Sequence, residues 1–182
     1  MKICIDAGHG GSDPGAVGTR PFVLREKTFA LDVSLMLEEE LELCDHWVVM
    51  TSRQDRTVSF AARAGFANRL DADLFVSIHA NAAATQTAEG MEVFHFPDSQ
   101  AGRIAARRVL RLMLRAFPTH RNRGIKEANF AVLRLTAMPA ILVECEFLSN
   151  PTQLRFLANT RNQRQMARAI AEGIHSLEPT PA

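Results

Sequence analysis

The first eighteen residues, MKICIDAGHGGSDPGAVG, contain a strand followed by a glycine-rich loop. Residues 2–7 have the length and the apolar character of a buried strand. Glycine and proline are so frequent over residues 8–18 that neither a helix nor a regular strand is expected there. Apolar side chains then recur at helical spacing over residues 25–43, which predicts that a helix follows the loop.

The remainder of the chain continues this alternation of strands and helices. We expect strands at residues 46–50, 74–79, 90–96 and 140–143, and a further short strand at 130–134. We expect helices at residues 55–70 and 99–117, a short helix that starts at 150–151, and a final helix at 162–177. Residues 119–127 are expected to form a polar loop. This order predicts an α/β fold, with a mixed, mostly parallel sheet flanked by helices on both faces.

The composition is that of an ordinary globular chain, because 47% of the 182 residues are hydrophobic and 23% are charged. One domain is expected over residues 1–177, and residues 178–182 resemble a C-terminal tail or the start of a linker. A net charge of +1 gives no general attraction for nucleic acid. No stretch of about 18 apolar residues occurs, so no membrane span is expected. The N-terminal strand also lacks the features of a signal peptide.

Basic residues are concentrated in one part of the chain. Residues 103–134 contain nine lysines or arginines and one acid, Glu127. A solvated helix face is the ordinary interpretation of such a run. The alternative is a surface that holds an anionic polymer by weak electrostatic attraction.

Four polar residues stand where a predicted strand or helix meets a loop: His9, Glu26, His79 and Glu144. Binding sites in open α/β sheets form beyond the carboxyl ends of the strands, so these side chains are expected to converge. Two imidazoles and one carboxylate suit a zinc ion with an open coordination position, and a second carboxylate suits proton transfer. Each residue taken alone has an ordinary explanation, as a loop histidine, a core histidine or a capping acid. The carboxylate at 144 is the hardest to explain in this way, because burying it costs several kcal/mol unless it is paired or bound.

The other histidines are weaker candidates, since none has a second candidate ligand at a matching strand end. They are His46, His95, His120 and His175, of which the second could form a wall of the cleft.

Four ordered blocks of the sequence resemble the catalytic domain of the zinc-dependent N-acetylmuramoyl-L-alanine amidases, amidase type 3. The blocks are IDAGHGGSDPGAVG (5–18), TSRQDRTVSFAARAGFANRLDADLFVSIHANAA (51–83), GMEVFHF (90–96) and MPAILVECEFLSNP (138–151). The resemblance covers nearly the whole chain and implies a mixed sheet of about six strands. It implies an enzyme that cleaves the amide bond between N-acetylmuramic acid and L-alanine of the peptidoglycan stem peptide, as autolysins and endolysins do.

The resemblance also assigns roles to residues. It implies that His9, Glu26 and His79 hold Zn²⁺ and that Glu144 is the catalytic general acid and base. The side chains of Asp6 and Asn81 are further candidates, which would orient the histidines from behind. The expected partner is peptidoglycan, the protein is expected to be a monomer, and its place of action is the bacterial cell wall, in the periplasm or outside the cell.

The chain departs from the family pattern at two places. Cys145 and Glu146 stand where the family usually has a small or polar residue followed by glycine or alanine. Alternation along a strand predicts that Glu146 shares the face of Glu144 and that Cys145 points away. A salt bridge between Glu146 and an arginine is the preferred ordinary interpretation of this second acid. The chain also has no tyrosine, whereas relatives often carry one in the strand where Phe94, His95 and Phe96 stand.

Three other functions remain open from the sequence. A zinc peptidase would use the same site on a peptide bond instead of the sugar–peptide bond. A thiol hydrolase would use Cys145 and would need a histidine base beside it. A wall-binding module without activity is the non-enzymatic alternative, although every expected ligand and the catalytic glutamate are present.

Overall fold

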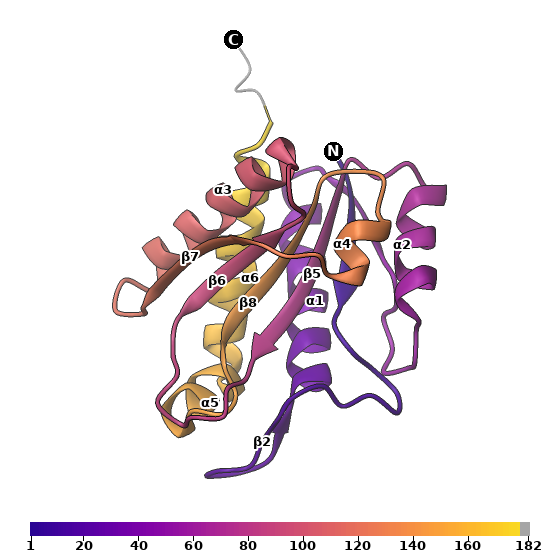
Figure 1. Ribbon diagram of the computed structural model, residues 1–182. Coiled ribbons are helices and arrows are strands. Elements are labelled where there is room, and N and C mark those ends of the chain that lie inside the picture. The colour runs from indigo at the N-terminus through magenta and orange to yellow at the C-terminus, as the bar shows by residue number, and fades with distance from the viewer. Residues whose placement is uncertain (179–182) are drawn as a thin grey trace.

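The structure is a computed structural model that describes residues 1–178, so most of the tail expected at 178–182 lies outside the described residues. Six strands form one sheet in the order β4-β1-β5-β8-β6-β7 (Figure 1). They are β1 (Lys2–Ala7), β4 (Trp47–Met50), β5 (Leu74–Asn81), β6 (Met91–His95), β7 (Asn122–Glu127) and β8 (Ala140–Phe147). Strands β4, β1, β5 and β8 run parallel, and β6 pairs antiparallel with β8. The expected α/β class with a mixed, mostly parallel sheet is confirmed.

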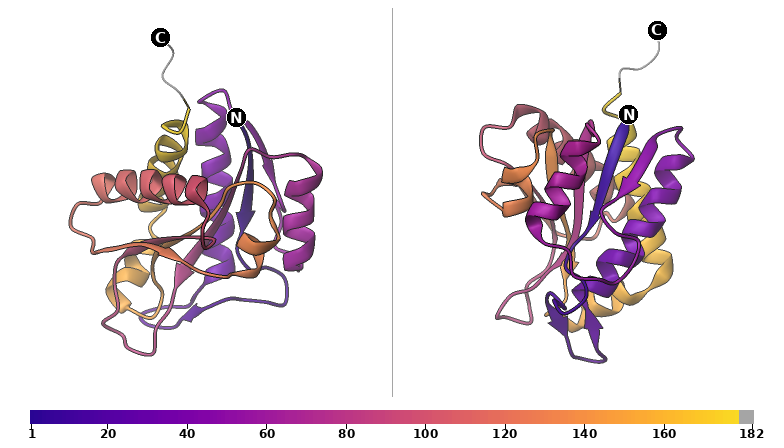
Figure 2. Two further views of the ribbon diagram at one scale, coloured as in Figure 1. Left: turned by 45° about the horizontal axis from the view of Figure 1, so that its top comes forward. Right: turned by 90° about the vertical axis from the view of Figure 1, so that its right-hand side faces the viewer.

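Helices cover both faces of the sheet (Figure 2). One face packs against α1 (Glu26–Glu42), α3 (Gln100–Ala116) and α6 (Thr160–His175), whose buried residues share the larger apolar core. The other face packs against α2 (Phe60–Arg69) and α4 (Ala131–Leu135), around a smaller core. The short helix α5 (Pro151–Ala158) follows β8, and a two-stranded ribbon of β2 (Val17–Gly18) and β3 (Leu24–Arg25) precedes α1. Within residues 1–178, no helix combines the length and the apolar character that crossing a membrane requires.

The helix expected from residue 55 begins later. Its N-cap is Ser59, whose side chain accepts a hydrogen bond from the backbone N–H of Ala62 at 3.2 Å. Asp55 instead accepts hydrogen bonds from the N–H of Gly11 at 2.6 Å and from Lys27 Nζ at 2.8 Å. The acid therefore ties the loop after β4 to the glycine-rich loop, a long-range role that its local capping preference does not reveal.

Two other predictions of secondary structure, for residues 119–127 and 130–134, were wrong. Residues 119–127 contain strand β7, the last strand at one edge of the sheet, which pairs with β6. An edge strand keeps much of its surface in water, so it lacks the apolar alternation that would have identified it. Residues 130–134 fall within helix α4 and its cap, where Val132 and Leu133 are buried against the smaller core. A segment this short has too few turns for its periodicity to separate helix from strand.

Candidate metal centre and catalytic cleft

Three residues that are far apart in the sequence meet at the carboxyl end of the sheet. Oε2 of Glu26 lies 3.1 Å from Nε2 of His9, and Oε1 of Glu26 lies 2.7 Å from Nδ1 of His79. One donor atom from each of the three residues lies within 4.8 Å of the other two. His9 follows β1, His79 is on β5, and Glu26 is the first residue of α1. The structure therefore brings the three expected ligands together, in a donor set that catalytic zinc sites use.

The glycine-rich loop makes this close approach possible. A Cβ atom at Gly8 would lie 2.4 Å from the ring of His79. A Cβ atom at Gly15 would lie 2.6 Å from both Glu26 and His9, and the φ of Gly15, 64°, is one that glycine adopts at no steric cost. His9 itself has a φ of 64°, an uncommon value for a residue with a side chain. Strain of this kind is frequently found at functional sites.

The second nitrogen of His9 is held by a residue that the sequence analysis missed. Nδ1 of His9 lies 2.8 Å from Oδ2 of Asp13, and the other oxygen of Asp13 accepts a hydrogen bond from the N–H of Gly15 at 3.0 Å. This contact orients the ring and leaves Nε2 directed at Glu26. Metal-binding histidines typically have such a partner on the far nitrogen. A carboxylate four residues after His9, in a turn-forming Asp-Pro-Gly sequence, was the available signal.

The proton affinities of these groups favour an ionised Glu26. The hydrogen bond with Glu26 is the main cause that raises the pKa of His9 to about 9, against the opposing effect of burial. Burial by itself would raise the pKa of Glu26, but hydrogen bonds from His79 and His9 outweigh it and hold that pKa far below its ordinary value. A carboxylate that stays charged beside two imidazoles suits a cation.

A chain of polar contacts lies behind His79 and reaches Asp6. Nε2 of His79 lies 3.1 Å from the hydroxyl of Ser77, which donates a hydrogen bond to Asp6 at 2.8 Å. Asp6 also accepts hydrogen bonds from Thr51 at 2.6 Å and from Arg63 at 2.8 Å. The carboxylate therefore acts on the imidazole through Ser77 and not by direct contact, and its role in orienting His79 stays a prediction.

Asn81 lies in a different network. Its amide nitrogen donates to Glu92 at 2.6 Å, and its oxygen accepts the N–H of Ala82 at 2.8 Å. Among the described residues, neither candidate zinc-binding histidine is a hydrogen-bond partner of Asn81. The carboxylate of Glu92, which the sequence analysis did not single out, is buried and also pairs with Arg123 at 2.9 Å and with Lys126.

Glu144 stands beside this centre with one oxygen unpaired. It is next to His79 in the register of β5 and β8. Its Oε2 is buried and has no hydrogen-bond partner among the described residues. Burial is the main cause that raises the pKa of Glu144 to about 7. An unpaired oxygen on a group that titrates near neutrality is what a proton-transferring residue needs.

Glu144 and both histidines line one cleft of about 470 Å³. The cleft lies between the sheet, α2 and the segment around α4, and its rim carries Phe60 and Phe130, which are 59% and 39% exposed. Exposed aromatic rings beside a polar centre suit a ligand with apolar faces, because water covers those rings poorly.

The prediction for Glu146 was wrong. The pairing of β5 with β8 advances two residues on β5, from His79 to Asn81, and three on β8, from Glu144 to Phe147. This bulge interrupts the alternation of faces, because one extra residue is accommodated on β8.

As a result, the carboxylate of Glu146 points to the face opposite Glu144. It accepts hydrogen bonds from the N–H of Gly90 at 2.9 and 2.8 Å, and it lies 2.9 Å from Nδ1 of His120. Its side-chain partner is thus a histidine and not the expected arginine.

Cys145 is fully buried in the larger core, which agrees with the expectation that it points away from Glu144. Burial raises the pKa of its thiol well above the ordinary value. A thiol in this environment is a poor nucleophile, and the thiol-hydrolase alternative loses its support.

A second histidine group lies at the opposite, amino end of the strands. Nε2 of His46 lies 3.2 Å from Nδ1 of His175, and Glu178 completes a set whose donor atoms lie within 4.8 Å of one another. Sequence reasoning missed this pair because His175 comes from the far end of α6. His9 and His79 of the first group line the cleft that contains Glu144, whereas no member of the second group does.

Comparison with known proteins identifies the family. The family described as N-acetylmuramoyl-L-alanine amidase, amidase type 3, matches residues 3–176. The chain is 37% identical to the N-acetylmuramoyl-L-alanine amidase CwlM of Bacillus licheniformis, over 96% of this chain and 67% of CwlM. It is 32% identical to the N-acetylmuramoyl-L-alanine amidase AmiC of Neisseria meningitidis, over 94% of this chain, and spans about half (51%) of the length of AmiC.

Solved structures agree with this match. The crystal structure of an N-acetylmuramoyl-L-alanine amidase from Clostridium difficile 630 superimposes with a TM-score of 0.92 at 36% identity, over 96% of this chain and 95% of that one. The catalytic domain of CwlV from Bacillus (Paenibacillus) polymyxa gives a TM-score of 0.90 at 35% identity, over 97% of both chains. The chain described here belongs to the N-acetylmuramoyl-L-alanine amidase family, amidase type 3.

Proposed function

We propose that this protein is a zinc-dependent peptidoglycan hydrolase that cleaves the amide bond between N-acetylmuramic acid and L-alanine of the stem peptide. The observation that carries the proposal is the convergence of His9, Glu26 and His79 beside Glu144, at a cleft that His9, His79 and Glu144 line. Family membership supplies the class of bond. A wall-binding module without activity would have no need for an unpaired buried carboxylate at this position.

The residues present fit a zinc ion. Two imidazole nitrogens and one carboxylate are a frequent ligand set of catalytic zinc, and the far nitrogens of His9 and His79 are held by Asp13 and Ser77. When bound, zinc lowers the pKa of a coordinated water and polarises a carbonyl oxygen.

Glu144 performs the proton transfers. Its unpaired Oε2 accepts a proton from the attacking water, and the same carboxyl group then delivers that proton to the departing nitrogen of L-alanine. A pKa raised to about 7 suits both roles, because the group takes up and releases a proton near neutral pH. The bulge after Glu144 directs Glu146 to the other face, so a single acid of β8 serves the reaction.

The substrate determines where the protein acts. Peptidoglycan lies in the periplasm or outside the cell, and we propose that the protein works there as a monomer. The relatives CwlM and AmiC are longer than this chain, which spans 67% and 51% of their lengths.

Metal analysis and product analysis test the function separately. Protein purified without added zinc should contain about one tightly held zinc per chain in the cleft. His79→Ala should lose that zinc and the turnover together, whereas His95→Ala, a change away from the ligand set, should keep both. Native turnover in the His79→Ala variant would contradict a zinc-dependent reaction at this site.

The products separate the amidase from the peptidase. Digestion of a defined muropeptide should release an intact stem peptide with a free L-alanine amine, as read by mass spectrometry. Cleavage between two amino acids of the stem would support the zinc-peptidase alternative instead of the amidase. That result would not contradict the proposed metal centre.

A further inference from the structure

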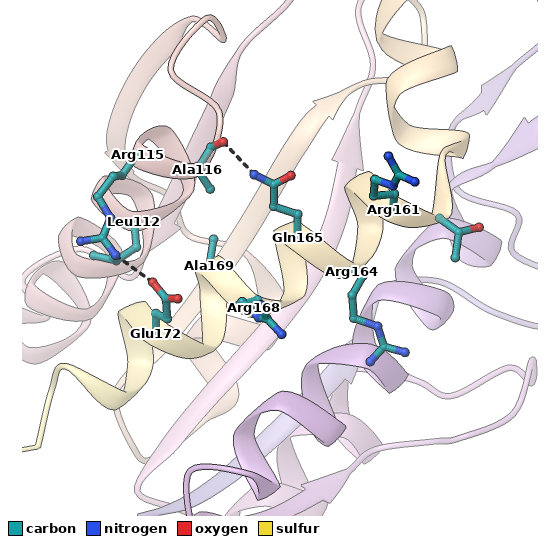
Figure 3. Close-up of a pocket in the computed structure, with 10 residues that line it drawn as sticks. Leu112, Arg115, Ala116, Arg161, Arg164, Gln165, Arg168, Ala169 and Glu172 are labelled. Atoms are coloured by element: carbon teal, nitrogen blue, oxygen red, sulfur yellow. Dashed lines mark hydrogen bonds and ion pairs between the residues drawn. The ribbon is translucent and has the colours of Figure 1, made fainter.

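A second hollow lies between α3 and α6, on the face of the sheet opposite Glu144. Its volume is about 660 Å³. Four arginines line it, Arg115 from α3 and Arg161, Arg164 and Arg168 from α6, together with the single acid Glu172 (Figure 3). We call these four arginines and the hollow between them the arginine trough.

The charge of the two helices is unusually one-sided. Together α3 and α6 contain eight arginines and one acid, on a chain whose net charge is only +1. Neither helix contains a lysine. Arginine differs from lysine in offering a planar fork of donors that matches the oxygens of a phosphate or a carboxylate. The composition therefore favours a ligand with oxyanion groups, of which phosphate is one, over a diffuse attraction to anions.

Neighbouring acids hold three of the arginines without using all of their donors. Nη2 of Arg115 bonds to Glu172 at 2.9 Å, Nε of Arg168 bonds to Glu40 at 3.3 Å, and Nη1 of Arg164 bonds to Glu39. Each of these bonds uses one nitrogen of a guanidinium group that carries five N–H donors.

The remaining arginine has no such restraint. Arg161 is exposed, and its guanidinium group makes no ion pair with any residue in the range 1–178. Figure 3 shows Arg161 and Arg164 projecting from the first part of α6, and Arg115 approaching from α3. Several donors are thus presented along one surface.

The apolar residues that line the trough are buried or small. Leu112 and Ala169 lie at its base and are buried, and Gln165 bridges the two helices by donating to the carbonyl of Ala116 at 2.9 Å. Helices that bind membranes expose large apolar side chains beside their basic residues. The lining of the trough has none, which favours a flexible polymer in water over a lipid surface.

We propose that the arginine trough binds an anionic polymer with repeating phosphodiester groups and thereby holds the enzyme on a phosphate-bearing cell wall. The site is separate from the reaction because the sheet lies between it and the cleft. A polymer bound in the trough leaves His9, His79 and Glu144 accessible. The basic segment at 103–134 thus contributes Arg115 through α3, whereas the other three arginines of the trough come from α6.

Binding to labelled poly(glycerol phosphate), measured by fluorescence anisotropy with the whole chain, tests the proposal. The unaltered protein should bind saturably and more weakly as salt rises. The double variant Arg161→Gln/Arg168→Gln should bind about tenfold more weakly. The matched control Arg69→Gln/Arg155→Gln removes two exposed arginines elsewhere and should bind as the unaltered protein does. Equal losses in both variants, or no binding by the unaltered protein, would overturn the proposal.

Two further measurements identify the occupant. Vesicles containing phosphatidylglycerol should bind more weakly than the polymer, and tighter binding to them with the same dependence on Arg161 and Arg168 would assign the trough to a membrane. Turnover of a small soluble muropeptide should be the same in both double variants, since neither touches the cleft. The binding readout does not require activity, so failure of the proposed reaction would leave this test intact.

Discussion

Glu144 and Glu146 are two acids on one strand, two residues apart, with opposite environments. Glu146 is fully buried, and its oxygens accept the N–H groups of Gly90 and Phe147 and approach His120. Glu144 faces the cleft with Oε2 unpaired. A buried carboxylate whose oxygens are satisfied stabilises the fold, whereas one left unsatisfied costs stability and is available for chemistry. The bulge between them separates the two roles.

The largest expected effect comes from removing the unpaired acid. Glu144→Gln should lower kcat by about 1,000-fold, because the attacking water loses its base and the leaving nitrogen loses its acid. Zinc content should stay at the native level, since Glu144 is not among the proposed ligands. Steady-state kinetics on a soluble muropeptide, with metal analysis of the same sample, would measure both. Retained turnover would take Glu144 out of the mechanism.

Removing the satisfied acid should damage the fold and not the chemistry. Glu146→Ala leaves the N–H of Gly90 and the ring of His120 without their partner, and should cost about 3 kcal/mol of unfolding free energy. The folded fraction should keep its turnover per molecule. Urea unfolding would measure the stability loss of Glu146→Ala against that of Glu42→Ala, which replaces an exposed residue on α1. A cost below about 1 kcal/mol would mean that Glu146 is not the structural acid of the pair.

The pH dependence of stability should distinguish Glu144 from an ordinary surface acid. Folding raises the pKa of Glu144 from 4.5 to about 7, so the native state holds this proton more tightly than the unfolded state does. Its contribution to stability is therefore present below pH 4.5 and is lost as pH rises through about 7. Glu144→Gln removes that loss, and with chelator present it should be more stable than the native protein by about 3 kcal/mol at pH 8.

The same comparison at pH 4.5 should give nearly equal stabilities, because both side chains are then neutral. Urea unfolding at the two pH values is the measurement. A variant that is no more stable at pH 8 would show that ionised Glu144 is not penalised by burial.

The smallest effect concerns an exposed acid that acts through a neighbour. Asp13 holds Nδ1 of His9 at 2.8 Å. Asp13→Ala should weaken zinc binding about tenfold, because the ring loses the contact that fixes its orientation. Competition with a chelator of known affinity would measure it. Asp45→Ala, which is exposed and far from the cleft, is the matched control and should leave zinc affinity unchanged.

Much of the site could be predicted because its residues follow locally recognisable elements. Apolar runs predict β1, β5 and β8, and parallel strands bring His9, His79 and Glu144 to one edge. The glycine-rich loop is likewise recognisable, because glycine and proline recur over residues 8–18.

The elements that were missed depend on partners far away in the sequence. Strand β7 lies at the edge of the sheet, where polar side chains can stay in water. It joins the sheet by pairing with β6, which precedes it by more than 25 residues in the sequence. The start of α2 moved because Asp55 bonds to the loop around Gly11 instead of capping the helix. The arginine trough joins two helices that are separated by 43 residues of other structure, so no single segment reveals it.

The amino-acid sequence by itself determined the parallel core strands, the long helices and the family, because periodicity and glycine placement are local properties of the chain. Only the tertiary structure decided which carboxylates are satisfied. The faces of Glu144 and Glu146 depend on a bulge in the pairing of β5 with β8, and the partners Gly90 and His120 come from other segments. Hydrogen-bond satisfaction is a property of the folded surroundings, and it distinguishes Glu144, the acid proposed for catalysis, from Glu146, whose oxygens are satisfied within the fold.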